Sequence, residues 1–571
     1  MIDFRNPNTL WASVLVETLH RCGATLAVIC PGSRSTPLTV AFANHPQITA
    51  IPILDERSAA FFALGRAKNT KIPTILVCTS GTAGANFYPA IIEAKESNVP
   101  LIVLTADRPP ELRHCHAGQT IDQLKLYGHF PNWQCELALP EATLPMLSYL
   151  RQTIIRAWYQ ALYPVAGVVH LNQPLREPLA PIEQSLSACE DTFPKNFFDS
   201  LAPFSVPKPK VPLPWHSWQG QTGIIVAGLA QPQDPQAYCQ AIAFLSQQLA
   251  FPVFAEALSP LRNYAHLNPY LVSTYDSILR QPLDDKLVPA VVIQIGELPI
   301  SKQLRKWLQK VDVPRWIIDP RIDDFDPLHD RTIHLPISIE QLAELDRPDT
   351  PAKPSDFCQR WLKLEAQTRA KIDSTLNSLD RLYEGKAAWL ISQHLAPNTP
   401  IFLANSMSVR YAEYFWQPNQ RQIVPYFSRG ANGIDGTLST ALGIATGEAG
   451  VLLTGDLALL HDTNGFLIGQ QFSGHLTIIL INNNGGGIFE ILPIANFPNF
   501  EKYFATPQEV KLAKLCEAYN AEHIEIRDWQ QLIDLICELP TTGIRVLELI
   551  CDRHADAAWL NKNVNTFTTS G

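Results

Sequence analysis

The sequence has no apolar run long enough to form a membrane-spanning helix. Although 46% of the 571 residues are hydrophobic, no stretch of about 18 uninterrupted apolar residues occurs. The N-terminal segment, residues 1–20, also lacks a basic region followed by an apolar one, so we expect no secretory signal there. These absences predict a cytoplasmic protein without a membrane partner.

Cysteine pairs typical of disulfide or metal sites are absent as well. The 11 cysteines include no C-x-x-C pair, and Cys30 and Cys78 lie within apolar segments, a pattern typical of reduced, packed thiols. We interpret His114, Cys115 and His116 as loop, because adjacent residues cannot easily converge on one tetrahedral zinc ion. The net charge of −9 argues against a nucleic-acid partner.

Two proline-rich stretches, residues 202–221 and 345–356, divide the chain into blocks that are each long enough for a domain. We predict domains at residues 1–200, 201–350 and 351–571. Within each block, short apolar runs alternate with helical patterns, as expected for parallel strands that are buried on both faces. The fold class we expect is therefore α/β, with three doubly wound domains and mostly parallel sheets.

The expected strands end without the glycine motif of dinucleotide-binding folds. No G-x-G-x-x-G opens any unit, which removes the main support for a nicotinamide or flavin dinucleotide. A helix is expected at residues 84–97. The expected strands are 25–30, 74–79, 101–106, 222–228, 290–296, 315–319, 400–406, 422–428, 450–456, 476–482 and 545–551.

Polar residues and glycines terminate two of these strands. Asp456 ends one of them, and Asn483, 27 positions later, follows another and precedes glycines 485–487. If the two strands are neighbours, both side chains enter one crevice at the carboxyl edge of the sheet. Carboxylate and amide oxygens suit Mg²⁺, which usually binds together with phosphates. Either motif alone is more often a turn or a helix cap, but the pair predicts a metal–diphosphate site.

The paired motifs resemble those of the thiamine diphosphate enzymes, in which GD is followed, after a similar interval, by NN. The resemblance implies thiamine diphosphate and Mg²⁺ as cofactors, with Mn²⁺ as the alternative cation. Asp456, Asn483 and the carbonyl of Gly485 would bind the metal. In this superfamily the activating glutamate and the metal–diphosphate site come from different subunits, which implies a homodimer or homotetramer with active sites at the subunit interface.

Thiamine diphosphate requires an acid that hydrogen-bonds N1′ of its pyrimidine ring. Glu56 stands where an apolar strand turns into a helix that carries Phe61 and Phe62, and burial there favours a protonated carboxyl. As an isolated feature it is more often an acidic residue in the first turn of a helix, worth about 0.3–1 kcal/mol through the dipole. Together with the metal motif, it becomes the candidate catalytic acid.

Four arginines, Arg34, Arg108, Arg410 and Arg429, follow four expected strands within a few residues. Guanidinium groups at the edge where ligands bind are suited to carboxylates. A single loop arginine is as often part of a surface salt bridge worth under about 1 kcal/mol. Four of them indicate substrates that carry several carboxylates.

A more specific resemblance extends from about residue 30 to 495. It is carried by the segments CPGSRSTPLT, DERSAAFFALG, TSGTAGANFYPA, TADRPPELR, GQTIDQ, NSMSVR, RGANGIDG and GDLALLHD with NNNGGGIF, and more weakly by GELPISKQL. Together they resemble the family of 2-succinyl-5-enolpyruvyl-6-hydroxy-3-cyclohexene-1-carboxylate synthases. This resemblance implies decarboxylation of 2-oxoglutarate and 1,4-addition of the succinyl carbanion equivalent to isochorismate, in menaquinone or phylloquinone biosynthesis.

The same resemblance implies the residues of the pocket. Ile434 would support the cofactor from below, and Ile488, Phe489 and Leu492 would form an apolar wall, although each is equally an ordinary core residue. The residues implied to contact the substrates are Ser33, Arg34, Arg108, Gln119, Lys302, Ser406, Arg410 and Arg429.

Two other interpretations stay open at this point. Another thiamine diphosphate-dependent 2-oxo acid decarboxylase or carboligase explains Glu56 and the metal motif equally well, but not the four arginines. A non-catalytic protein that keeps the fold is disfavoured because both Glu56 and Asp456 are present.

Overall fold

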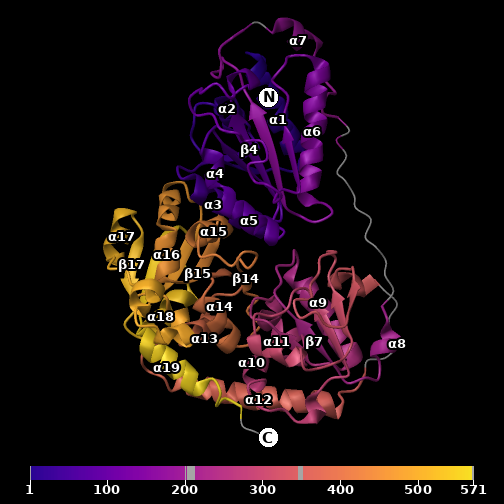
Figure 1. Ribbon diagram of the computed structural model, residues 1–571, viewed down its shortest axis with the longest axis vertical. Coiled ribbons are helices and arrows are strands. Elements are labelled where there is room, and N and C mark those ends of the chain that lie inside the picture. The colour runs from indigo at the N-terminus through magenta and orange to yellow at the C-terminus, as the bar shows by residue number, and fades with distance from the viewer. Residues whose placement is uncertain (1, 185, 200, 202–212, 345–351, 569–571) are drawn as a thin grey trace. The chain divides into compact units, whose positions relative to one another are not determined.

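The computed structural model describes residues 2–184, 186–199, 201, 213–344 and 352–568, and Figure 1 shows its elements. Within these residues the chain forms three six-stranded sheets, and all neighbouring strands in them are parallel. This confirms the predicted α/β class. Most of the two proline-rich stretches, 202–212 and 345–351, lies outside the described residues, as does the domain boundary predicted at 350.

The first sheet has the strand order β2-β1-β3-β4-β6-β5. Its strands are β1 (Leu26–Ile29), β2 (Thr49–Pro52), β3 (Thr74–Cys78), β4 (Leu101–Asp107), β5 (Trp133–Glu136) and β6 (Val168–Pro174). The accompanying helices are α1 (Pro7–Cys22), α2 (Thr36–Ala43), α3 (Glu56–Thr70), α4 (Ala83–Asn86), α5 (Tyr88–Glu96), α6 (Leu144–Leu162) and α7 (Ser187–Thr192). Helix α6 runs beside β4 in Figure 1 and packs with α1 around one buried apolar cluster.

The second sheet has the order β12-β11-β10-β7-β8-β9. Its strands are β7 (Gly223–Ala227), β8 (Val253–Ala255), β9 (Leu271–Val272), β10 (Val291–Ile295), β11 (Arg315–Ile318) and β12 (Thr332–Leu335). Ile225 and Ile293 belong to one apolar cluster, whereas Ile224 and Val292 belong to another. Because side chains alternate along a strand, both faces of this sheet are covered. Its helices are α8 (Trp215–Trp218), α9 (Pro235–Leu249), α10 (Tyr275–Ile278), α11 (Lys302–Leu308) and α12 (Asp356–Asn377).

The third sheet has the order β14-β13-β15-β16-β18-β17. Its strands are β13 (Pro400–Leu403), β14 (Val424–Tyr426), β15 (Ala449–Gly455), β16 (His475–Asn482), β17 (Glu522–Glu525) and β18 (Gly543–Ile550). Its helices are α13 (Glu384–His394), α14 (Met407–Phe415), α15 (Thr437–Ile444), α16 (Asp456–His461), α17 (Leu512–Ala518), α18 (Trp529–Cys537) and α19 (Arg553–Asn563). Strands β15 and β16 are neighbours, with Gly455 opposite Ile481, as the metal-site prediction requires.

By its contacts the chain forms two compact units. One contains residues up to 206 with 428–448 and 460–474; the other contains 207–427, 449–459 and 475 onward. The first unit therefore joins α15 to the first sheet through α3.

Glycines allow these two helices to touch along their backbones. A Cβ at Gly65 would lie 2.0 Å from the carbonyl oxygen of Thr440, and one at Gly443 would lie 2.1 Å from that of Phe62. Any larger residue at either glycine would push α3 and α15 apart.

All the expected strands are present, with ends that differ by a few residues. The helix expected at 84–97 is divided into α4 and α5. The first proline-rich stretch is not linker throughout, because Trp218 is buried in the apolar cluster of the second sheet. Among the described residues, no helix is both long and apolar enough to cross a membrane.

Candidate active site

The predicted metal ligands lie at the carboxyl ends of two neighbouring strands. Asp456 begins α16 directly after β15, and Asn483 directly follows β16. The Asp456 carboxylate accepts hydrogen bonds from the backbone N–H groups of Leu457 at 2.9 Å and Gly485 at 2.8 Å. Burial raises the pKa of the Asp456 carboxyl to about 6, against the lowering effect of these hydrogen bonds. A cation beside it would favour the ionised form.

The side-chain amide of Asn483 is held at one end only. Its Nδ2 donates to Oε1 of Glu384 at 2.7 Å, whereas its Oδ1 is buried and accepts no hydrogen bond from the described residues. A buried acceptor without a partner is costly, and a metal ion would supply the missing partner. The donor set of this edge, one carboxylate and one amide oxygen, therefore fits a hard cation such as Mg²⁺.

The glycines after Asn483 shape the loop around these ligands. Gly485 has φ of +136°, and a Cβ there would lie 2.4 Å from the carbonyl oxygen of Ala505. A Cβ at Gly487 would lie 2.6 Å from Nδ2 of Asn483. The Gly485 carbonyl, which the resemblance implies as a third ligand, accepts a hydrogen bond from the Gly487 N–H at 2.9 Å and keeps a second lone pair.

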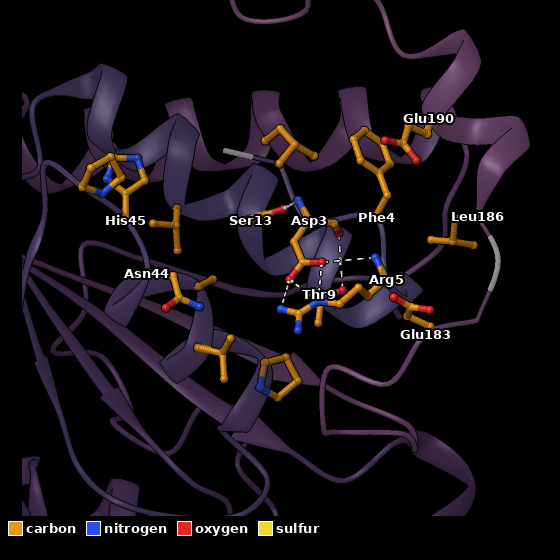
Figure 2. A pocket seen from close by; sticks show the side chains of 16 residues that line it. Asp3, Phe4, Arg5, Thr9, Ser13, Asn44, His45, Glu183, Leu186 and Glu190 are labelled. Carbon is orange, nitrogen blue, oxygen red and sulfur yellow. Dashed lines mark hydrogen bonds and ion pairs between the residues drawn. The ribbon is translucent and has the colours of Figure 1, made fainter.

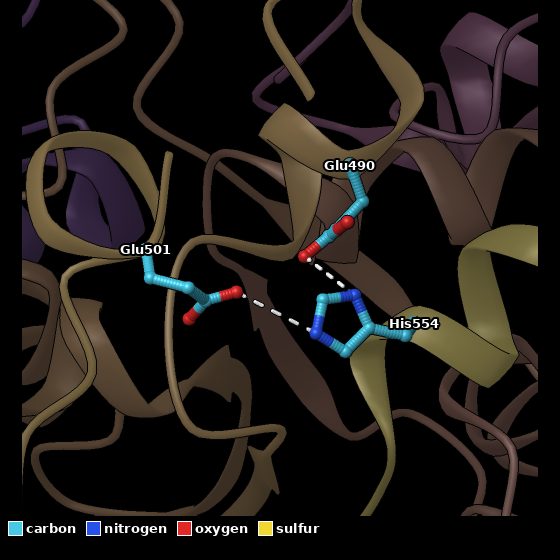
Figure 3. Close-up of side chains that lie close together, drawn as sticks. All are labelled: Glu490, Glu501 and His554. Carbon is cyan, nitrogen blue, oxygen red and sulfur yellow. Dashed lines mark ion pairs between the residues drawn. The ribbon is translucent and has the colours of Figure 1, made fainter. Parts of the chain in front are cut away.

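An ion-pair cluster supports the same loop from the side of α19. The Nη1 of Arg553 donates to the carbonyl of Asn484 at 2.8 Å, and the guanidinium also pairs with Glu490 and Glu501. His554 lies between the two glutamates, as Figure 3 shows. The side chains of Glu490, Glu501 and His554 resemble a metal-binding group, but both carboxylates already pair with Arg553. We assign the cluster to holding the loop rather than to a cation.

In the first unit, three strands bring polar residues together at the carboxyl edge of the first sheet. Arg34 follows β1, and its N–H donates to Oγ1 of Thr79, next to β3, at 3.2 Å. Nε2 of Gln119 donates to the carbonyl of Ser80 at 2.9 Å. Arg108 directly follows β4, and its Nε and Nη2 donate to the carbonyl of Gly118 at 3.2 and 3.0 Å.

The guanidinium groups of Arg34 and Arg108 affect each other. The pKa of the Arg34 guanidinium is lowered, mainly by burial and next by the charge of Arg108. Nε of Arg34 is buried and donates no hydrogen bond to the described residues. Ser33, beside it, is exposed. The other nitrogens of the Arg34 guanidinium pair with Glu177 at 3.4 Å and donate to the Leu175 carbonyl at 3.0 Å. The unused Nε donor, with Arg108 nearby, suits an anionic ligand.

A cavity of about 530 Å³ adjoins this edge. It is lined by the loop from Leu112 to Leu124, with the exception of Cys115, Gly118 and Gln119. In this loop His114, His116 and Gln119 have positive φ values of 59°, 56° and 58°. Non-glycine residues rarely adopt this conformation, and such outliers are a reason to test a loop for function.

Glu56 is the first residue of α3 and is half-buried. Asp55 caps this helix, since its Oδ1 accepts from the N–H of Ser58 at 2.9 Å. Helix α3 also contacts the turn before α15. Gly436 in that turn has φ of +63°, and a Cβ there would lie 1.9 Å from Cγ of Phe61 on α3. Ile434 stands two residues before Gly436, so the first unit contains two of the predicted cofactor-contacting residues, Glu56 and Ile434, on segments that touch.

The segment that follows β14 is bound by the same unit. Glu93 of α5 accepts hydrogen bonds from the N–H groups of Gly430, at 3.1 Å, and Ala431, at 2.7 Å. Arg429 directly precedes these residues. Glu93 was not among the residues expected to support the site, because it lies within a helix 337 positions earlier.

The other predicted pocket residues are in the second unit. Ser406, at the start of α14, has φ of +72° and ψ of −124°, a strained backbone for a non-glycine residue. Its carbonyl accepts a hydrogen bond from Nη1 of Arg410, and burial lowers the pKa of the Arg410 guanidinium. Lys302 is exposed at the start of α11.

The three predicted apolar wall residues, Ile488, Phe489 and Leu492, are half-buried rather than fully enclosed in the core. Phe489 packs edge-on against Phe504, with ring centroids 5.7 Å apart. Partial exposure leaves their side chains able to contact a ligand.

The cavity drawn in Figure 2, of about 810 Å³, lies elsewhere in the first unit, between α1, α2 and residues 183–190. No predicted site residue lines it. Within it Arg5 already pairs with Asp3 at 2.6 Å. We assign no ligand to it.

Comparisons with known proteins agree with this geometry. Residues 11–126 match the family model described as "Thiamine pyrophosphate enzyme, N-terminal TPP binding domain". Residues 207–403 match "Middle domain of thiamine pyrophosphate", and residues 405–548 match "Thiamine pyrophosphate enzyme, C-terminal TPP binding domain". The fold and the site thus define a thiamine pyrophosphate (thiamine diphosphate) enzyme.

Curated relatives make the class more specific. The chain is 62% identical to the 2-succinyl-5-enolpyruvyl-6-hydroxy-3-cyclohexene-1-carboxylate synthase of Gloeothece citriformis (strain PCC 7424), over 99% of both chains. It is 59% identical to the synthase of that name from Trichodesmium erythraeum (strain IMS101), again over 99% of both chains. The identity to that of Rippkaea orientalis is 58%, over 98% of this chain and 96% of the relative. The chain belongs to the family of 2-succinyl-5-enolpyruvyl-6-hydroxy-3-cyclohexene-1-carboxylate synthases, which are transferases.

Proposed function

We propose that this enzyme catalyses the thiamine diphosphate- and Mg²⁺-dependent decarboxylation of 2-oxoglutarate, followed by 1,4-addition of the succinyl unit to isochorismate. The product would be 2-succinyl-5-enolpyruvyl-6-hydroxy-3-cyclohexene-1-carboxylate, made in the cytoplasm for menaquinone or phylloquinone. The name shared by the relatives supports this product. The observation that carries the choice of substrates is the placement of Arg34 and Arg108 at one sheet edge, where the buried Nε of Arg34 donates no hydrogen bond to the described residues.

When bound, thiamine diphosphate supplies the nucleophilic carbon and the electron sink for loss of CO₂. Glu56 would hydrogen-bond its pyrimidine N1′ and so hold a proton at that atom. Asp456, Asn483 and the Gly485 carbonyl would hold the Mg²⁺ that binds the diphosphate. Ile434, at the turn before α15, would support the bent cofactor.

The polar residues would orient the two acids. Each substrate carries two carboxylates, so the four arginines would offer one guanidinium to each of the four carboxylates. Arg34 and Arg108 would bind at the edge of the first sheet, and Arg410 and Arg429 would bind at the segments after β13 and β14. Removal of these charges from water strengthens their attraction for the substrates. The remaining polar contacts proposed are Ser33, Gln119, Lys302 and Ser406.

The active assembly we propose is a homodimer or homotetramer, with each active site at a subunit interface. The three predicted domains, 1–200, 201–350 and 351–571, would then serve as pyrimidine, central and diphosphate domains. The family resemblance supports this arrangement.

The proposed reaction is tested by the release of CO₂ from 2-oxoglutarate by the purified protein with thiamine diphosphate and Mg²⁺. We expect slow release alone and fast release when isochorismate is added. Pyruvate, which has a single carboxylate, is the control substrate and is expected to give little CO₂. If pyruvate reacts and 2-oxoglutarate does not, the enzyme is instead another thiamine diphosphate-dependent decarboxylase or carboligase.

A further inference from the structure

The two ends of the Asn483 side-chain amide, its oxygen and its NH₂ group, are similar in size but differ in chemistry. The oxygen can bind a hard cation, whereas the NH₂ group cannot. Some other group must therefore determine which of them faces the proposed metal site. In this structure the contact at the NH₂ end is the 2.7 Å hydrogen bond to Oε1 of Glu384.

We propose that Glu384 is a positioning residue, which fixes the amide of Asn483 with its oxygen directed to the metal. This inference rests on the proposed function of Asn483 as a ligand. In the reverse orientation the amide oxygen would face Glu384, and the NH₂ group, which cannot bind a cation, would face the metal site.

Glu384 is itself held in place. It is 4% exposed and begins α13. Its backbone N–H donates to Oδ2 of Asp556 at 3.0 Å, and Asp556, on α19, also pairs with Arg381. Its carboxyl also interacts with the side chain of Tyr411, on α14. A carboxyl fixed by two helices is a rigid acceptor, which is what orientation of a ligand requires.

Space around the amide is restricted as well. A Cβ at Gly487 would lie 2.6 Å from Nδ2 of Asn483 and 3.7 Å from Oε1 of Glu384. The glycine thus leaves room for this hydrogen bond and for no larger residue. Glu384 itself begins a helix and does not follow a strand end, so the motifs that identify the ligands do not point to it.

The chain contains a matched control, the hydrogen bond between Glu548 and Asn482, which is the residue directly before Asn483. Nδ2 of Asn482 donates to Oε1 of Glu548 at 2.6 Å, and Glu548 is also buried, at 7% exposure. Consecutive residues at the end of a strand direct their side chains to opposite faces. The two asparagines therefore make the same kind of bond, but only that of Asn483 belongs to the proposed metal ligand.

The test is the affinity for Mn²⁺, measured by electron paramagnetic resonance in the presence of saturating thiamine diphosphate. Glu384→Met keeps the volume but removes the acceptor, and we expect it to weaken Mn²⁺ binding about 10–100-fold. Glu384→Gln, which keeps an acceptor oxygen, is expected to restore most of the affinity. The control, Glu548→Met, is expected to bind Mn²⁺ as the wild type does. Thermal unfolding without metal shows whether each variant is folded; if Glu384→Met is not, Glu384→Ala, which leaves room for water, replaces it.

Wild-type affinity in the folded Glu384→Met or Glu384→Ala protein would overturn the proposal. Equal weakening by Glu548→Met would overturn it too, because the effect would then be a general loosening of the loop. Failure of the wild type itself to bind Mn²⁺ with thiamine diphosphate would instead refute the proposed metal site.

Discussion

The backbone of the segment after β14 is bound by one buried carboxylate, that of Glu93 on α5. Its two oxygens accept the N–H groups of Gly430 and Ala431, and it lies 3.9 Å from the buried ammonium of Lys68. In Glu93→Gln a single amide oxygen replaces two carboxylate oxygens, so one N–H loses its acceptor, at about 1–3 kcal/mol. Lys68 also loses its buried counter-charge, and we expect a total loss of about 3–5 kcal/mol.

The assay is chemical unfolding of the protein together with the KM for each acid substrate. Because Arg429 directly precedes Gly430, we expect the KM of one substrate to rise at least about tenfold. The control is Glu96→Gln, which makes the same charge change on the same helix but at an exposed residue; it should change stability by less than about 0.5 kcal/mol. If Glu93→Gln matches Glu96→Gln in both stability and KM, the argument from buried hydrogen bonds is wrong.

Three further predictions concern the cofactor and substrate residues. Glu56→Gln should abolish turnover but still bind Mg²⁺ and thiamine diphosphate. When this variant is mixed with inactive Asp456→Ala and the subunits are reassembled, the mixture should show about a quarter of wild-type activity if sites lie between subunits. It should show none if each site lies within one chain. Burial raises the pKa of the Asp456 carboxyl to about 6, and this carboxyl must lose its proton to bind metal. The Mn²⁺ affinity should therefore reach its full value above pH 7 and be about tenfold weaker at pH 5. Titration with Mn²⁺ at a series of pH values tests this, and an affinity that does not change with pH contradicts it. Arg410→Ala should raise the KM of one acid substrate, and unchanged kinetics for both would remove it from the pocket.

The expected strands were found because they are continuous apolar runs, which buried parallel strands must be. Strand β6 was not predicted, although it lies between β4 and β5, because His170 and Asn172 interrupt its apolar pattern. In the fold both are buried beside Thr105 of β4, whose hydroxyl hydrogen-bonds them at 2.8 and 2.9 Å. The hydrophobic pattern of a sequence cannot show that a buried polar group has its hydrogen-bond partner on a neighbouring strand. The other missed strands are short, such as β9, with two residues.

The site divides along a similar line. Asp456, Asn483 and the arginines are candidates from the sequence because each is a polar residue that follows an apolar strand, and strand ends are where ligands bind in this class of fold. Their supports could not be predicted this way. Glu384 and Glu93 lie on helices, and they meet the site only through packing between segments distant in sequence, 99 and 337 positions apart.

The two adjacent asparagines at the end of β16 show why the fold is needed to assign their roles. In the sequence Asn482 and Asn483 are chemically identical, and either could supply an amide oxygen. The alternation of side chains at a strand end sends the first to Glu548 on the neighbouring strand β18 and the second to Glu384 on α13. Only the second has a buried oxygen without a partner among the described residues. The proposed difference between a structural amide and a ligand therefore lies in the direction of each side chain, which in this structure is set toward a different acidic partner in each case.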